Sequence, residues 1–510
     1  MNAAGRARPL PPQPATPIPP AAWPVTAPAA AASVAAAPDL AQGAPGLPER
    51  RMRLRYGLNE TDNWWYFALG PARARIQAGY RALGTQVVRI FLFDKHAPDP
   101  VAEWPLFAAY VQAVLDVGAT PMVTFARFDP PFDDATARRR FVTRCADTVW
   151  GCVEQWGGEV VRDWYWCIWN EPNNDRIGGG LAFDQYHAIY REVAQTLLRW
   201  LAPYLAGHPP RIGGPAVDGF QPFWLDWIRQ FVHDVDPALV GFTSWHRYGD
   251  WRTNGEWLAP ADDAAFCSLL LAQTPDYEAR ARTVARLLAK RDVRNICGEL
   301  NAHSHHDPRV SRRFNQSVFG AAYYASALIH LIRGGADVEM LWTGTDDTGP
   351  YGLLDKHGHP TPVFHAKRLC ASYVRFGDWV SFPEPVVTDD GSAGPDLDVL
   401  VARSDTGRRS ALLVHLRDAR ATYLLGRWGG AVPQEGILLK LDRGSGGVVT
   451  EMEAGERITF DGYGVAVVTS ERVSDAPGDS DWPAPPGAPS GAAGAVSERG
   501  GARRGREGRG

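Results

Sequence analysis

The chain has 510 residues and a formal net charge of −4, and 45% of its residues are hydrophobic. This length is enough for two or three domains, or for one large barrel with an appended domain. The near-neutral charge argues against nucleic acid or an anionic membrane as the main partner, because proteins that bind either normally carry a basic patch. The sequence contains no apolar run of about 18 residues, so it predicts no membrane-spanning helix.

The six cysteines lack the Cys-x-x-Cys spacing of zinc sites. Cys145 and Cys152 lie two turns apart on a predicted helix, about 10 Å, which is too far for a disulfide. We therefore expect mainly buried thiols, and we predict no metal and no cofactor. The N-terminal segment lacks the uninterrupted apolar core of a secretory signal, so a cytoplasmic location is the default expectation. Secretion would require a signal peptide at a different true N-terminus.

Two terminal segments have the composition of disordered chain. Residues 1–48 are rich in Pro and Ala, and residues 474–510 are rich in Pro, Gly, Ala and Arg. Neither segment has much apolar surface to bury, so we expect no packed structure in either.

Between residues 49 and 377, short apolar runs alternate with longer amphipathic segments, a pattern typical of a parallel sheet covered by helices. The predicted strands are 52–58, 86–93, 120–125, 164–169, 211–214, 240–246, 295–298 and 338–342. The predicted helices are 72–83, 103–117, 135–156, 183–201, 223–232, 276–291, 312–333 and 362–374. Eight strands, each followed by a helix, predict an α/β fold of the (β/α)8 TIM-barrel type.

The pattern changes between residues 378 and 473 to short alternating strands separated by turn residues. We predict strands at 397–402, 410–416, 422–425, 437–441, 448–451, 457–460 and 465–469. This segment therefore predicts a C-terminal β-sandwich domain.

Two predicted barrel strands end in a glutamate. The fourth strand runs into Asn170 and Glu171, and Pro172 stops the strand because it has no N–H to donate. The seventh strand runs into Glu299 in the same way. Strand periodicity places Cys167, Trp169 and Glu171 on one side of the fourth strand, and Asn295, Cys297 and Glu299 on one side of the seventh. In a TIM barrel the active site lies at the carboxyl ends of the strands, so closure of the barrel would bring the two carboxylates together.

Trp169-Asn170-Glu171-Pro172 resembles the acid/base signature of the clan A glycoside hydrolases, in which a glutamate nucleophile ends strand seven. The segment from Ser244 to Tyr248 is similar to the Ser/Thr-x-His-x-Tyr segment of the same clan. The segment from Gly352 to His365, followed by a sandwich, most resembles family 39, which includes β-xylosidases and α-L-iduronidases. The chain departs from the pattern in lacking an aromatic residue next to Glu299, which leaves the sugar open.

The resemblance implies a retaining glycosidase that cleaves O-glycosidic bonds of an oligosaccharide or polysaccharide. Glu171 would be the acid/base and Glu299 the nucleophile, and Asn170 would form a hydrogen bond with the sugar 2-hydroxyl. Arg89 and Tyr248 are candidate donors to Glu299. The remaining candidate contacts to substrate are His246 and Trp342. The sequence indicates no oligomeric state.

Other interpretations of these residues stay open. Asp346 and Asp347 are competing candidates for the nucleophile, and Arg89 and His246 could instead serve the barrel interior or hold a loop. Trp64, Trp65, Trp251 and Trp257 could stack on sugar rings or pack in the core. The crowded spacing of His303, His305, His306 and Asp307 does not favour a metal site. The alternative function is an inactive carbohydrate-binding protein on the same fold.

Overall fold

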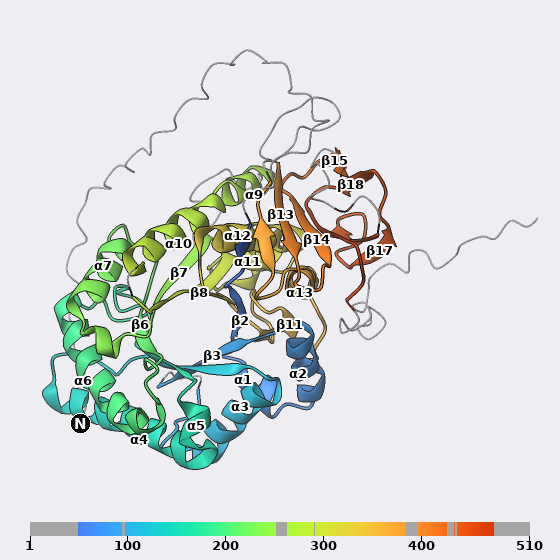
Figure 1. Cartoon of the computed structure of the whole chain (residues 1–510). Coiled ribbons are helices and arrows are strands. Elements are labelled where there is room, and N and C mark those ends of the chain that lie inside the picture. Colours follow the sequence, from blue (N-terminus) through green and yellow to red (C-terminus); the bar gives the residue numbers. More distant parts are fainter. Residues whose placement is uncertain are drawn as a thin grey trace, which may run out of the picture. The chain divides into compact units, whose positions relative to one another are not determined.

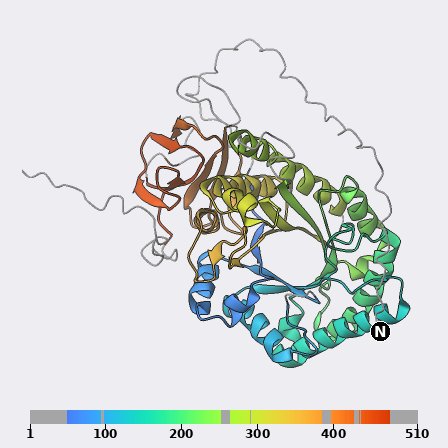
Figure 2. The same ribbon diagram turned by 180° about the vertical axis from the view of Figure 1, so that it is seen from behind.

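The computed structural model describes residues 49–93, 97–250, 263–289, 291–383, 396–425, 433 and 436–473. Within these residues, eight parallel strands close into a barrel with helices around it, as Figures 1 and 2 show from opposite sides (Figure 1, Figure 2). The barrel strands are β2 (Arg55–Asn59), β3 (Val87–Leu92), β4 (Thr120–Phe125), β5 (Tyr165–Ile168), β6 (Ile212–Val217), β7 (Phe242–Asp250), β8 (Arg294–His303) and β9 (Val338–Leu341). The predicted TIM barrel is confirmed.

Helices lie around these strands and pack against the barrel. They are α1 (Trp64–Ala68), α2 (Arg73–Ala82), α3 (Trp104–Asp116), α4 (Ala135–Trp156), α5 (Gly158–Val161), α6 (Phe183–Leu201), α7 (Trp224–Asp234), α9 (Asp263–Leu271), α10 (Pro275–Leu288), α11 (Pro308–Asn315), α12 (Val318–Gly334) and α13 (Pro362–Tyr373). Two short 3-10 helices, η1 (Ala202–Tyr204) and η2 (Pro237–Leu239), and a small parallel pair, β10 (Thr345–Asp346) with β11 (Leu354–Asp355), complete the layer. Asp134 is the N-cap of helix α4, and its side chain accepts from the N–H groups of Thr136 and Ala137.

One predicted helix, 312–333, is in fact two. Helix α11 ends at Asn315 and α12 begins at Val318, with Ser317 between them in an extended conformation. The Ser317 hydroxyl accepts from the N–H of Gly320 and so starts the second helix. The break is needed because α12 is buried on almost every side, whereas the charged end of α11 faces solvent. Helical spacing alone did not reveal this change of direction.

The C-terminal region forms an antiparallel sheet with strand order β1-β12-β13-β14-β19-β16-β17 and a separate pair, β15 with β18. The strands are β1 (Arg50–Arg51), β12 (Trp379–Ser381), β13 (Leu397–Arg403), β14 (Arg409–His415), β15 (Arg420–Leu424), β16 (Ile437–Asp442), β17 (Thr450–Glu453), β18 (Arg457–Asp461) and β19 (Gly464–Thr469). Strand β1 pairs with β12, so residues at the start of the predicted barrel segment lie in the antiparallel sheet.

The large sheet is apolar on both faces. Along β14, Ala411 and Leu413 pack in the cluster shared with the β15–β18 pair, whereas Leu412 and Val414 belong to the cluster shared with the barrel helices. Helices α12 and α13 both contact β19, which anchors the sheet to the barrel. Alternating strand residues therefore serve two cores, which explains why these strands are more continuously hydrophobic than a half-exposed sheet requires.

All six cysteines are free and buried, as expected for thiols in a packed core. Among the described residues, no helix is long and apolar enough to cross a membrane.

Candidate active site

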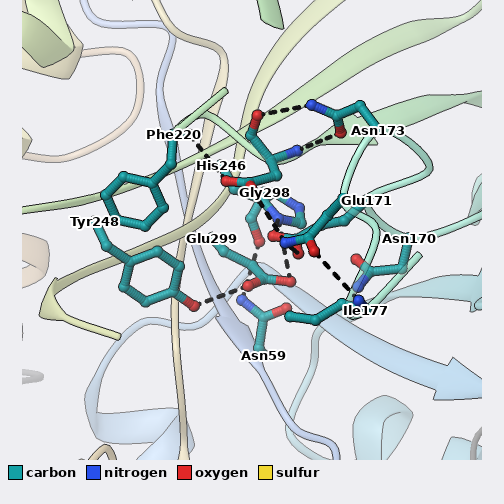
Figure 3. Close-up of polar contacts among 12 residues, drawn as sticks. Asn59, Asn170, Glu171, Asn173, Ile177, Phe220, His246, Tyr248, Gly298 and Glu299 are labelled. Atoms are coloured by element: carbon teal, nitrogen blue, oxygen red, sulfur yellow. Dashed lines mark hydrogen bonds and ion pairs between the residues drawn. The ribbon is translucent and has the colours of Figure 1, made fainter. Parts of the chain in front are cut away.

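Glu171 and Glu299 meet at the carboxyl ends of the barrel strands. One carboxylate oxygen of each glutamate and a ring nitrogen of His246 all lie within 4.8 Å of one another. Figure 3 shows the two carboxyl groups turned toward each other, with His246 beside them and Tyr248 reaching Glu299 (Figure 3). Both glutamates are buried. Barrel closure has therefore brought together two acids that lie far apart in the sequence.

Glu171 reaches the site through a bend in the backbone and not through strand periodicity. Strand β5 ends at Ile168, and Trp169 and Glu171 both have positive φ, 78° and 47°. Trp169 consequently packs outside the barrel, edge-on to Phe128 and Phe141. The predicted alignment of Cys167, Trp169 and Glu171 on one side is wrong, because the chain leaves the extended conformation after Ile168.

The bend is held by backbone contacts on both sides. The N–H of Glu171 donates to the carbonyl of Ala216 in β6, 2.9 Å away, and the indole N–H of Trp169 donates to the carbonyl of Gly178 at 2.8 Å. Gly178 lies so close to Glu171 that a Cβ atom there would be 1.8 Å from the Glu171 carbonyl oxygen. The glycine run beginning at Gly178 is thus part of the support for Glu171.

Glu299 is turned inward by an irregularity in β8. The pairing of β8 with β7 shifts register between Cys297 and Glu299, and the pairing with β9 shifts between Cys297 and Leu300. Cys297 packs in the outer core, whereas Ile296 packs inside the barrel. The predicted alignment of Asn295, Cys297 and Glu299 is therefore also wrong, because one extra residue at the bulge moves Glu299 to the opposite side from Cys297.

Gly298 occupies the bulge, and its neighbours leave no room for a side chain. A Cβ atom at this position would lie 2.3 Å from the hydroxyl oxygen of Ser244. The Gly298 carbonyl accepts from the side-chain amide of Asn59 at 3.0 Å.

Two donors hold the carboxylate of Glu299. Arg89 Nη1 lies 2.7 Å from Oε1, and the Tyr248 hydroxyl donates to Oε2 at 2.8 Å. Arg89 is fully buried, and its guanidinium stacks 4.4 Å from the ring centre of Phe91. A charged donor and a neutral donor together fix the position of the Glu299 carboxylate.

Glu171 has the opposite electrostatic environment. Burial raises its pKa to about 7, an effect that the charge of Arg89 and a hydrogen bond from Asn174 only partly oppose. Its Oε1 lies 2.8 Å from His246 Nδ1. Burial lowers the pKa of His246 to about 3, so this imidazole is neutral and places no positive charge beside Glu171. Glu171 is therefore set to hold a proton near neutral pH, while Glu299 is hydrogen-bonded to Arg89 and Tyr248.

Arg89 also orients Asn170. Its Nη2 donates to Asn170 Oδ1 at 2.7 Å, so the amide NH₂ of Asn170 is turned away from Arg89. The remaining donors of Arg89 bind Thr124 at 3.0 Å and Asn59 at 3.3 Å. One guanidinium thus fixes residues from β2, β4, β8 and the loop after β5.

Trp342 follows β9 and is half-buried, with its ring edge-on to Phe91 at 5.8 Å. Trp64 is buried and stacks on Tyr110 at 5.2 Å, which is packing, whereas Trp65 is 47% exposed. Trp251 and Trp257 lie outside the described residues.

The competing acids are occupied within their own loop. Asp346 accepts from the N–H groups of Gly349 and Tyr351, and Asp347 pairs with Lys356 at 2.8 Å. These contacts are those of loop-stabilising residues.

The candidate metal segment is engaged in local contacts as well. His303 Nδ1 lies 2.9 Å from the Ser311 hydroxyl, and Asp307 caps α11 and pairs with Arg309. The grouping of Glu171, His246 and Glu299 has donors that suit a cation. The positive charge of Arg89 at 2.7 Å from Glu299 disfavours one there.

Three polar residues of the site escaped the sequence prediction: Asn59, Asn174 and Asp218. Asn174 donates to Glu171 Oε2 at 3.2 Å and to Asp218 Oδ2 at 3.1 Å. Asp218 comes directly after β6, which ends at Val217, but the predicted strand ended at residue 214, so the strand-end criterion did not reach Asp218.

No protein-family model matches the chain. A β-xylosidase from Geobacillus stearothermophilus is 25% identical over 229 residues, which make up 42% of this chain and 42% of that protein. The matched region thus spans well under half the length of this curated relative. Among solved structures, a β-xylosidase of glycoside hydrolase family 39 from Caulobacter crescentus has a TM-score of 0.54 at 16% identity, covering 85% of this chain and 98% of that one.

A family 51 α-L-arabinofuranosidase from Bifidobacterium longum has a TM-score of 0.59 at 14% identity, covering 84% of this chain and 98% of that one. Likenesses at these identities show the shared fold, a barrel with an appended antiparallel sheet. With the sequence match to a β-xylosidase, they agree with the resemblance carried by the Asn-Glu-Pro motif. The chain is therefore similar in fold to glycoside hydrolases of families 39 and 51, and part of its sequence is similar to a β-xylosidase.

Proposed function

We propose that this protein is a retaining glycoside hydrolase, with Glu171 as acid/base and Glu299 as nucleophile. The observation that carries the proposal is the pair of buried carboxylates with oxygens within 4.8 Å of each other. Retaining glycosidases hold their two carboxyl groups about 5 to 5.5 Å apart, whereas inverting enzymes separate them by about 6.5 to 9.5 Å to admit a water. The short separation supports direct attack by one carboxylate.

In the first step, Glu299 attacks the anomeric carbon, and the bond from that carbon to the leaving oxygen breaks. The proton of Glu171 passes to the leaving oxygen, so an alcohol departs and a glycosyl ester remains on Glu299. In the second step, the Glu171 carboxylate takes a proton from water as the water oxygen attacks the anomeric carbon. The ester bond breaks and Glu299 regains its charge. Two inversions give net retention, and the steps require no cofactor.

The residues around the two glutamates suit these two reaction steps. A raised pKa of about 7 lets Glu171 hold its proton in the free enzyme, and loss of the Glu299 charge in the ester would allow it to act as a base. Arg89 and Tyr248 hold Glu299 for attack. The NH₂ group of Asn170, oriented by Arg89, is the proposed donor to the sugar 2-hydroxyl. Trp342 and His246 are proposed to complete the contact surface for the sugar.

The substrate is proposed to be a xylose-containing or related glycan, on the strength of the sequence match to a β-xylosidase. The test is a panel of 4-nitrophenyl glycosides that begins with β-D-xylopyranoside and α-L-arabinofuranoside, with the product anomer followed by NMR. We expect turnover of at least one substrate with retention of configuration. A product of inverted configuration would exclude the double displacement, and no turnover of any member, with intact fold, would contradict the glycosidase assignment.

A further inference from the structure

We propose that Asp218 is a positioning residue for Glu171 that acts through the side-chain amide of Asn174 and through its own charge. The inference rests on the proposed function, in which Glu171 is the proton donor. Asp218 follows β6, whereas Glu171 and Asn174 follow β5, so the contact joins two adjacent strand ends of the barrel.

The amide of Asn174 bridges the two carboxyl groups. Its Nδ2 lies 3.2 Å from Glu171 Oε2 and 3.1 Å from Asp218 Oδ2. Its Oδ1 accepts from the backbone N–H groups of Arg176 at 2.9 Å and Ile177 at 3.2 Å. Because the carbonyl oxygen is engaged by two backbone donors, the NH₂ group must face the carboxyls and gives one hydrogen to each.

Asp218 is itself held rigidly. Asn173 donates to the Asp218 carbonyl at 3.0 Å and accepts from its N–H at 2.9 Å, and Figure 3 shows Asn173 above the pair of glutamates (Figure 3). The N–H of Phe220 donates to Asp218 Oδ1 at 2.9 Å. Asp218 is only 5% exposed. The consecutive residues Asn173 and Asn174 thus hold the backbone and the carboxylate of one aspartate.

The shared amide places two acids close together in a buried site. Burial and, to a smaller extent, the charge of Glu171 raise the pKa of Asp218 to about 7. Two neighbouring carboxylates cannot both ionise without repulsion, so a charge on either one favours a proton on the other. The charged and titratable groups that face this pair are Arg89 on β3, His246 and Tyr248 on β7, Glu299 on β8 and Arg280 on α10, which pairs with Asp276.

The test compares pH profiles of kcat/KM for wild type and Asp218→Asn on a phenyl glycoside, whose poor leaving group needs the acid. The sugar is the one that the wild type cleaves fastest as a 4-nitrophenyl glycoside. Removing the charge of Asp218 should move the alkaline decline of kcat/KM to lower pH by about one unit. At pH values above that decline, kcat/KM should then be about tenfold below that of the wild type. On a 2,4-dinitrophenyl glycoside of the same sugar, the loss should be much smaller because that leaving group needs no proton.

Asn174→Ala provides a second variant with the opposite expected sign. It removes a hydrogen bond that favours ionised Glu171, so the alkaline limb should move to higher pH. Asp184→Asn is the matched control, because Asp184 is exposed in the first turn of α6, and its limb should stay in place. Shifts of the alkaline midpoint in opposite directions in the two variants would distinguish this role from one that only holds the two loops together.

If Asp218 and Asn174 only hold the two loops together, both variants should lower kcat/KM equally at every pH. An alkaline midpoint that is unchanged in both variants would overturn the inference. If Asp218→Asn does not fold, the direction in which the alkaline midpoint of kcat/KM moves in Asn174→Ala decides the test: a shift to higher pH supports the inference, and no shift overturns it. The proposed function fails separately, through a wild type without turnover or a Glu171→Ala variant that cleaves the phenyl glycoside as fast as wild type.

Discussion

Arg89 forms a buried ion pair with Glu299, with 2.7 Å between Nη1 and Oε1, and its other terminal nitrogen lies 2.7 Å from Asn170 Oδ1. One planar group therefore sets both the proposed nucleophile and the proposed 2-hydroxyl donor. A lysine could not do this, because its ammonium group lacks the planar guanidinium that donates to two acceptors in fixed directions.

Replacement of Arg89 by lysine should separate geometry from charge. Lysine keeps the positive charge but cannot hold Glu299 and Asn170 together, so we expect kcat/KM to fall by about 100-fold or more. Arg229→Lys is the control, because Arg229 pairs with Asp226 on the exposed side of α7. Steady-state kinetics on an aryl glycoside check this. Wild-type kcat/KM in Arg89→Lys would show that the fork is dispensable.

The pH profile should follow the proton on Glu171. Burial raises the pKa of Glu171 to about 7, so the acid form dominates below that pH and disappears above it. The kcat/KM of the wild type on a phenyl glycoside should therefore decline with a midpoint near pH 7. The measurement is a set of initial rates from pH 5 to 9. A plateau that continues to pH 9 would mean that Glu171 is not the limiting acid.

Gly178→Ala should disturb the site without touching a polar group. The added methyl would meet the Glu171 carbonyl oxygen at 1.8 Å, so the loop must shift and carry Glu171 with it. We expect a loss of kcat of at least about 100-fold. Gly455→Ala is the matched control, because nothing lies within 4 Å of the added atom there. The account of the loop fails if both variants have equal activity.

His330 should make the junction between α10, α12 and β13 sensitive to pH. Its Nδ1 lies 3.1 Å from Glu278 Oε2, and its Nε2 lies 3.6 Å from Asp398 Oδ2. Burial alone would lower the pKa of His330, but the hydrogen bonds and charges of Asp398 and Glu278 outweigh it and raise the pKa. The folded pKa thus exceeds the unfolded one, and the stabilisation is full below the unfolded pKa and is lost as pH rises through the folded pKa.

The variant His330→Gln should therefore lower the free energy of unfolding by about 1 to 2 kcal/mol at pH 5.5, and by less at pH 9. Urea denaturation at both pH values measures the difference from wild type. His233→Gln, on the exposed end of α7, is the control and should change little at either pH. An equal loss for His330→Gln at pH 5.5 and pH 9 would show that its charge plays no part.

Much of the fold could be predicted because it depends on periodicity. The eight barrel strands and seven of the later strands were predicted from short apolar or alternating runs between turn or helix patterns. The break between α11 and α12 could not be predicted in this way, because both segments have helical spacing and only burial by the second sheet distinguishes them.

The sequence predicted which residues would come together in the candidate site, but not how the backbone turns their side chains toward one another. Position after a strand identified Glu171 and Glu299, and the structure brings both together with Arg89, Asn170, His246 and Tyr248. Side-chain parity failed for both glutamates, because the positive φ of Trp169 and the bulge at Gly298 are local departures from an ideal strand. Asp218 lacked a signal of its own, since its importance comes from a partner on the neighbouring loop.

The most direct test of the account is azide rescue of Glu299→Ala on a 2,4-dinitrophenyl glycoside of the sugar that the wild type cleaves. We predict almost no turnover in buffer, and recovery with azide to give a glycosyl azide of inverted configuration, since azide takes the place of the missing carboxylate on the same face. Wild-type turnover by Glu299→Ala without azide would contradict the account.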